Sequence, residues 1–162
     1  MAERTVVVIG VGNELRGDDG AGIAVARRLR DPADAAGIEV REARGEPTAL
    51  FDVWQGADAV VLVDTMRSGS AAGTVLRYDA SGQPLPARLR TTSSTHAFAL
   101  DEVIELGRAL QRLPERLIVF AVEGRTFDAG SGLSDELERV TPALADAVLR
   151  EAVALAAESA TG

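Results

Sequence analysis

Apolar residues gather in short, uninterrupted runs along the chain, and polar stretches separate these runs. Three of the runs are rich in β-branched residues and have the length of strands: residues 5–10, 59–64 and 117–122. Continuous apolar runs of this length are typical of strands that are buried on both faces of a parallel sheet. Residues 38–41 predict a further strand, and the alternating segment TVLRY at 74–78 predicts an edge strand.

Between these strands, apolar residues recur at the spacing of amphipathic helices. The segment 19–30 predicts a helix that stops near Asp31 and Pro32, because proline disfavours helical backbone at the residue before it. Residues 47–54 predict a short helix and residues 98–110 a longer one. Strands that alternate with helices indicate an α/β fold with a mostly parallel sheet that is covered on both faces.

The last third of the chain adds a helix, and a long loop precedes it. We expect the final helix to begin with Thr141 as its cap and Pro142 at its first helical position. The stretch from 79 to 95 is polar, contains proline and has little periodicity, so it predicts a long functional loop.

Ligands of such sheets bind beyond the carboxyl ends of the strands. Three predicted strand ends carry charge: the loop after Gly10, Asp64 itself, and Glu123. Glu123 is open to two interpretations, a base or substrate contact and a solvated surface carboxylate. We therefore expect the chemistry of the protein at this edge of the sheet.

Composition narrows the class of protein. With 162 residues, of which 46% are hydrophobic, we expect one domain over residues 1–162. The net charge of −8 disfavours nucleic acid and anionic membrane surfaces as partners. The chain lacks cysteine, a basic N-terminal leader and a long apolar span, so we expect a cytoplasmic protein, with a monomer as the default.

The glycine loop GVGNELRGDDG matches the dinucleotide fingerprint only in part. Gly10 and Gly12 are present, but Leu15 occupies the position of the third glycine. Asp18 and Asp19 would repel a pyrophosphate at the start of the following helix. A nucleotide-binding module remains an alternative, and a plain structural interpretation is that one of the two aspartates caps the helix.

A cation explains the negative charge better. Asp19 and Asp64 would meet if their strands are neighbours, and His96, the single histidine, would add a nitrogen ligand. Three ligands leave coordination positions open for water or substrate. A lone histidine is also commonly structural or solvated. A serine hydrolase based on Ser93 or Ser94 with His96 as the base is disfavoured, because the chain has no G-x-S-x-G elbow.

Four motifs in order give the chain a family resemblance: GVGNELRGDDGAG, VLVDTMRSG followed by GTVLRYD, SSTHAFALDEVIEL, and VEGRTFDAGSGLS. The chain resembles the hydrogenase maturation proteases, endopeptidases that trim the C-terminal extension from the large subunit of [NiFe] hydrogenase. The resemblance implies a three-layer α/β/α sandwich with a mostly parallel central sheet. It also implies one hydrolysis per [NiFe] hydrogenase large-subunit precursor, after nickel insertion.

Carried over to this sequence, the family's catalytic and metal-binding residues are Asp19, Asp64 and His96. Asp18 would be a helix cap or a group behind the ligands. The resemblance implies that nickel arrives with the substrate, and that zinc or cadmium can replace it as surrogates. Two roles of the metal stay open, recognition alone and activation of the peptide bond. A non-catalytic, metal-responsive maturation partner or chaperone with the same fold is the alternative function.

One segment departs from the family pattern. Many members carry an Asp-Gly-Gly turn after the second strand, where this chain reads EARGEP at 42–47. The departure leaves the three proposed ligands in place, but no substrate contact can be carried over from that turn.

Overall fold

The computed structural model describes residues 4–44, 47–84 and 100–158. It contains a five-stranded sheet with the strand order β2-β1-β3-β5-β4. Four strands run parallel and β4 pairs antiparallel with β5 at the edge. The strands are β1 (Val6–Val11), β2 (Glu39–Ala43), β3 (Ala59–Met66), β4 (Val75–Asp79) and β5 (Arg116–Glu123). The predicted mostly parallel α/β fold and the edge strand at TVLRY are confirmed.

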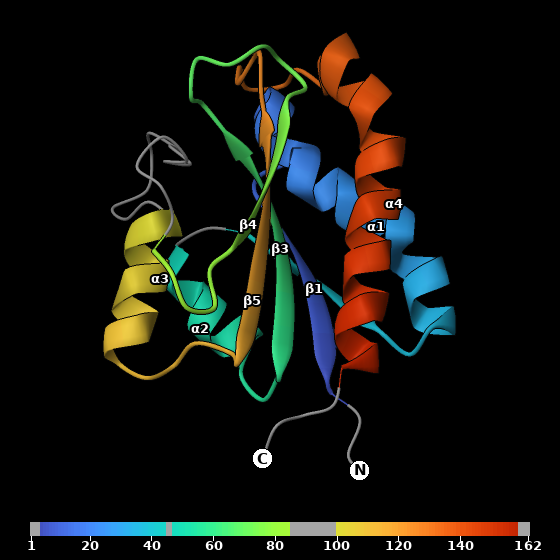
Figure 1. The fold of residues 1–162 in the computed structure, drawn as a ribbon. Helices are drawn as coiled ribbons and strands as arrows, with labels where there is room; N and C mark the ends of the chain where they lie inside the picture. Colours follow the sequence, from blue (N-terminus) through green and yellow to red (C-terminus); the bar gives the residue numbers. More distant parts are fainter. Residues whose placement is uncertain (1–3, 45–46, 85–99, 159–162) are drawn as a thin grey trace.

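Helices cover both faces of the sheet (Figure 1). The helices are α1 (Ala21–Ala35), α2 (Leu50–Val53), α3 (Leu100–Ala109) and α4 (Asp135–Ala157), with short 3-10 turns η1 (Gly17–Gly20) and η2 (Pro47–Ala49). Helices α1 and α4 lie on one face, and α2 and α3 on the other. Successive strand residues point to opposite faces, so Val6 and Val8 pack under α1 and α4, whereas Val7 and Ile9 pack under α2 and α3. Burial on both faces explains why these strands are continuous apolar runs.

Helix α1 lies unusually close to the sheet because glycines face each other across the contact. A Cβ atom on Gly10 of β1 would lie 2.2 Å from the carbonyl oxygen of Gly22 in α1. A Cβ on Gly22 would lie 2.4 Å from the carbonyl oxygens of both Val11 and Val63. Gly22 thus permits the close approach of helix and strand that the absent third glycine of the dinucleotide fingerprint would otherwise permit. This contact places the start of α1 beside Val63, the neighbour of Asp64 in β3.

Helix α1 continues beyond the predicted stop at Asp31 and Pro32, and ends at Ala35. Pro32 removes one hydrogen bond from the last turn. Ala33, however, is fully buried in the core, and its carbonyl oxygen accepts a hydrogen bond from the backbone N–H of Ile38. Packing of this turn therefore outweighs the local preference of proline.

The predicted start of the last helix is wrong. Helix α4 begins at Asp135 with Ser134 as its cap, and the Ser134 side chain accepts a hydrogen bond from the backbone N–H of Leu137. Thr141 lies inside the helix, where its hydroxyl donates to the Leu137 carbonyl oxygen at 2.6 Å. Acidic residues in the first turn favour the earlier start, because they interact well with the helix N-terminus.

Candidate functional site

Three loops meet at the carboxyl edge of the sheet: residues 12–20 after β1, 67–74 after β3 and 124–134 after β5. Backbone hydrogen bonds join the first loop to the third, from Gly17 to Ser131 at 3.1 Å and from Asp18 to Thr126 at 2.7 Å. Gly17 has a φ of +57°, and a Cβ at this position would lie 2.5 Å from the Thr126 carbonyl oxygen. Glycine at position 17 is therefore required for the two loops to touch.

The Asp18 side chain is fully buried where these loops meet. Its carboxylate accepts hydrogen bonds from the backbone N–H groups of Arg125 at 2.7 Å, Thr126 at 3.1 Å and Ser134 at 2.7 Å. The hydroxyl of Ser134 adds a fourth, at 2.8 Å. Of the two roles expected for Asp18, that of a cap of the first helix is wrong, because the side chain makes no cap hydrogen bond to η1 or α1, and that of a group behind the ligands stays a prediction. Asp18 instead fixes the loop after β5 and the start of α4.

Asp64 lies within β3 rather than at its end, because β5 continues beside it. It pairs with Ala121 of β5, whereas the pairing of β3 with β1 stops one residue earlier, at Val63 and Gly10. Asp64 is therefore the first residue of β3 beyond its pairing with β1, at the level of Val11, which the glycine loop follows. Its side chain is buried, with 8% of the residue exposed.

The structure brings Asp19 and Asp64 into one electrostatic environment. Burial raises the pKa of the Asp64 carboxyl well above its ordinary value of 3.8. The backbone N–H of Thr65 opposes this rise, and the negative charge of Asp19 adds to it. The Thr65 hydroxyl also donates to the backbone carbonyl oxygen of Asp18 at 2.8 Å, which ties β3 to the loop that carries Asp19. Two carboxylates close enough for one charge to raise the pKa of the other are donors that suit a divalent cation.

The third predicted ligand, His96, lies outside the described residues, as do Ser93 and Ser94. Within the ranges that the structure describes, no three His, Cys, Asp or Glu side chains are grouped as a metal site would require. The set of Asp19, Asp64 and His96 therefore stays a prediction. Of its three members, the structure relates only the two acids, through the effect of the Asp19 charge on the pKa of Asp64. Most of the predicted long loop at 79–95 also lies outside the described residues.

Glu123, at the end of β5, is a buried structural carboxylate. Only 3% of the residue is exposed, so the interpretation as a solvated surface group is wrong. Its carboxylate accepts hydrogen bonds from the backbone N–H of Ser68 at 2.9 Å and of Ser70 at 3.3 Å, and from the Ser68 hydroxyl. These bonds engage the carboxylate in shaping the loop after β3, which argues against Glu123 as a base.

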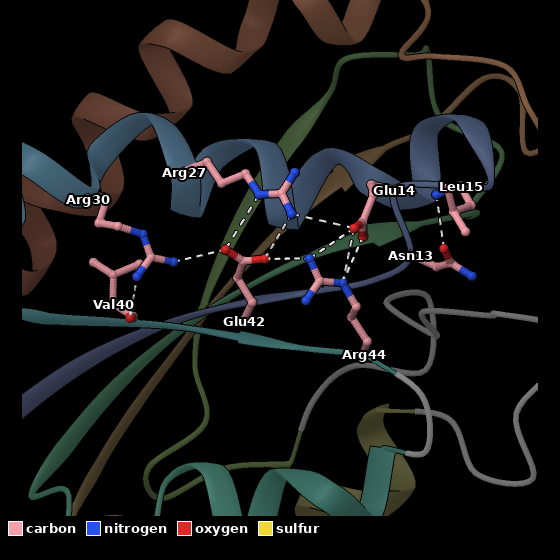
Figure 2. Close-up of polar contacts among 8 residues, drawn as sticks. All are labelled: Asn13, Glu14, Leu15, Arg27, Arg30, Val40, Glu42 and Arg44. Atoms are coloured by element: carbon pink, nitrogen blue, oxygen red, sulfur yellow. Dashed lines mark hydrogen bonds and ion pairs between the residues drawn. The ribbon is translucent and has the colours of Figure 1, made fainter.

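Figure 2 shows an ion-pair network beside the glycine loop, formed by Glu14, Arg27, Arg30, Glu42 and Arg44. Arg44 lies in the segment that replaces the Asp-Gly-Gly turn. Its Nε and Nη2 atoms each lie 2.9 Å from a carboxylate oxygen of Glu14, and Nη2 lies 2.6 Å from Glu42 Oε1. Arg44, in the segment that departs from the family pattern, thus joins the end of β2 to the glycine loop through ion pairs.

The Arg44 guanidinium lowers the pKa of Glu14 from 4.5 to about 2. Because the folded state binds the Glu14 proton more weakly than the unfolded state, this pair stabilises the fold above pH 4.5 and loses its effect as the pH falls toward 2. In Arg44→Gln, we expect the Glu14 midpoint to move upward toward 4.5, as measured by NMR titration of the carboxyl carbon. An unchanged midpoint would exclude Arg44 as the cause.

Comparison of this chain with known protein families identifies the family to which it belongs. The family model of the hydrogenase maturation proteases matches residues 23–151, which is most of the chain. The chain belongs to the hydrogenase maturation protease family. The resemblance inferred from the four sequence motifs is thereby confirmed.

Individual relatives within the hydrogenase maturation proteases are distant in sequence. The chain is 28% identical over 144 residues to the hydrogenase expression/formation protein HupD of Thiocapsa roseopersicina, and the match covers 86% of this chain and 64% of HupD. The chain thus spans less than two thirds of the length of this curated relative.

Two solved structures of maturation proteases share the fold. The [NiFe] hydrogenase maturation protease HycI from Thermococcus kodakarensis aligns with a TM-score of 0.71 at 20% identity, over 92% of both chains. HybD from the same organism aligns with a TM-score of 0.69 at 23% identity, over 91% of this chain and 98% of HybD. Among the described residues, none of the helices combines the length and apolar character needed to cross a membrane.

The role of Asp18 and the start of α4 were not predicted from the sequence, and the two belong to one structural feature, the contact between Asp18 and Ser134. Ser134 precedes Asp135 and Glu136, and a serine before acidic residues and an apolar run signals a helix start. The Thr141-Pro142 pair gave a competing signal. That Asp18 would bind the cap residue of α4 has no sequence signal, because 116 positions separate the two residues.

Proposed function

We propose that this protein is the endopeptidase that removes the C-terminal extension of a [NiFe] hydrogenase large-subunit precursor after nickel insertion. In this proposal Asp19, Asp64 and His96 bind the nickel that the precursor carries. Family membership supports the class of reaction. The observation that carries the site is that the buried carboxyl of Asp64, just beyond the pairing of β3 with β1, lies near enough to Asp19 for that negative charge to raise its pKa.

The donor chemistry fits a metal that belongs to the substrate. Two carboxylates and one imidazole are ligands that nickel accepts, and zinc or cadmium would be accepted by the same set. The raised pKa of Asp64 means that its ionised form is costly without a nearby cation. A nickel-containing precursor would supply that cation, and an unfilled precursor would not. The site would then favour the precursor only when its metal is in place.

The chain's own residues hold this site in shape. Asp18 fixes the loop after β5, the Gly10–Gly22 contact presses α1 onto the sheet, and Thr65 connects β3 to the loop of Asp19. The metal would polarise the scissile carbonyl or the attacking water when bound. The protein groups would position the precursor tail against it.

The experiment is cleavage of the nickel-loaded precursor, followed by mass spectrometry of the large subunit. We expect the wild type to shorten the subunit by one defined segment, and His96→Ala to be slower by about tenfold or more, because loss of a metal-site group typically costs 10- to 100-fold. Full activity in His96→Ala would exclude the histidine. Binding of the precursor without any shortening would support the non-catalytic partner instead.

A further inference from the structure

An arginine-lined pocket opens beside the candidate site. Its volume is about 590 Å³, and its lining residues are Arg16, Arg67, Arg125, Thr126, Phe127 and Asp128. The three arginines come from the three loops that follow β1, β3 and β5. A pocket of this size is within the range of sites that hold small ligands or peptide side chains.

The charge of the pocket is opposite to that of the protein. Three arginines and one aspartate line it, whereas the whole chain has a net charge of −8. Asp128 in the lining and the pair of Arg125 with Glu136 offset part of this charge, and the three guanidinium groups together still favour an anion over a cation in the cavity. A locally positive cavity on an acidic protein also directs anionic groups to this place on the surface.

Two of the arginines are held in place by neighbours. The Arg67 guanidinium stacks over the Phe127 ring, 3.7 Å from its centroid. A guanidinium donates hydrogen bonds in its own plane, so a contact through its face leaves those donors for a ligand. Arg125 pairs through Nη1 with Glu136 at 2.7 Å, and its backbone N–H is bound to Asp18. The contact of the Arg125 backbone with Asp18 thus connects the pocket to the loops of the candidate site.

The pocket and the two acids belong to neighbouring parts of the chain. Arg67 follows Asp64 by three residues, and Arg125 is bound to Asp18, the neighbour of Asp19. Phe127 packs against the backbone at Gly124, where a Cβ would lie 2.5 Å from its ring. A peptide that places its scissile bond at Asp19 and Asp64 therefore has this pocket within a few residues of its length.

We infer that the pocket of Arg16, Arg67 and Arg125 is a substrate subsite that binds a carboxylate of the precursor tail. This inference rests on the proposed function and adds a second recognition element to it. Guanidinium groups bind carboxylates with paired, charge-assisted hydrogen bonds. The carboxylate belongs either to an acidic side chain of the tail or to the chain terminus.

The test compares the wild type with Arg67→Gln, Arg125→Gln and the double variant, all on the nickel-loaded precursor. Arg150→Gln, which replaces an exposed arginine far along α4, is the matched control. We expect the double variant to raise KM about tenfold with kcat within about twofold, because the subsite contributes binding rather than chemistry. We expect the control to match the wild type.

Two altered precursors identify the source of the carboxylate. One has neutral amides in place of the acidic residues of the tail, and the other has a neutral Gly-Ser extension that displaces the terminal carboxylate. We expect one of them to raise the wild-type KM about tenfold and to abolish the difference between wild type and double variant. Equal KM values for wild type and double variant, or a difference that persists with both altered precursors, would overturn the subsite alone. A wild type that cleaves no precursor would overturn the proposed function and this subsite with it.

Discussion

Replacing Asp18 by alanine is expected to destabilise the protein by about 3–5 kcal/mol, because it removes the acceptor of four hydrogen bonds in a buried position. Three backbone N–H groups would lose their partner, and each buried donor without an acceptor costs about 1–3 kcal/mol. For a domain of this size the loss corresponds to a fall in melting temperature of about 10 °C. Differential scanning calorimetry measures it directly.

Two further variants separate the Asp18 contacts from the general effect of losing a charge. Asp18→Asn keeps one oxygen but turns an amide N–H₂ toward backbone donors, so we expect an intermediate loss. Asp34→Ala removes an exposed carboxylate from α1 and should change stability by less than about 0.5 kcal/mol. A melting temperature for Asp18→Ala within a degree of the wild type would show that the loop after β5 does not depend on this carboxylate.

Asp64→Asn is expected to lower cleavage of the nickel-loaded precursor by about a hundredfold or more, because Asp64 is one of the proposed ligands of the substrate's metal and asparagine lacks its negative charge. The same substitution is expected to stabilise the fold near neutral pH. Burial makes the charged form of Asp64 costly, and asparagine has the same shape without the charge. A variant that is more stable and almost inactive would be the sign of a residue kept for function.

The stability that Asp64→Asn gains over the wild type should increase as the pH rises. The unfolded chain releases the Asp64 proton near its ordinary pKa of 3.8, whereas the folded chain holds it to higher pH. The wild type therefore loses stability as the pH rises from about 4 through the raised pKa, and Asp64→Asn does not. Urea unfolding at pH 3.5 and pH 8 checks this. A difference between the two proteins that is the same at both pH values would contradict the raised pKa.

The strands were predictable because each is a continuous apolar run that only a doubly covered sheet can bury. The sheet then explains why Asp19 lies near enough to Asp64 to raise its pKa, since β1 and β3 are neighbours and ligand groups of such sheets gather at the carboxyl ends of the strands. The close approach of α1 through Gly22 completes the juxtaposition. The sequence pattern does not predict that β3 continues beyond Asp64 to Met66. That extension depends on β5, which pairs with β3 as far as Glu123.

The roles of individual carboxylates were harder to predict. Asp18 and Asp19 are adjacent and chemically identical, and only the turn of the glycine loop directs Asp18 into the molecule. Glu123 follows an apolar strand in the same manner as a surface residue would, and its burial depends on the loop that contains Ser68. The arginine pocket combines residues from three distant segments, so no local pattern reveals it.

Cleavage of nickel-loaded and nickel-free precursor by the wild-type protein, side by side, tests most directly whether two acids and a histidine recognise the metal of the substrate. We predict that the nickel-loaded large subunit is shortened and that the nickel-free form keeps its extension under the same conditions. Equal shortening of both forms would contradict the account.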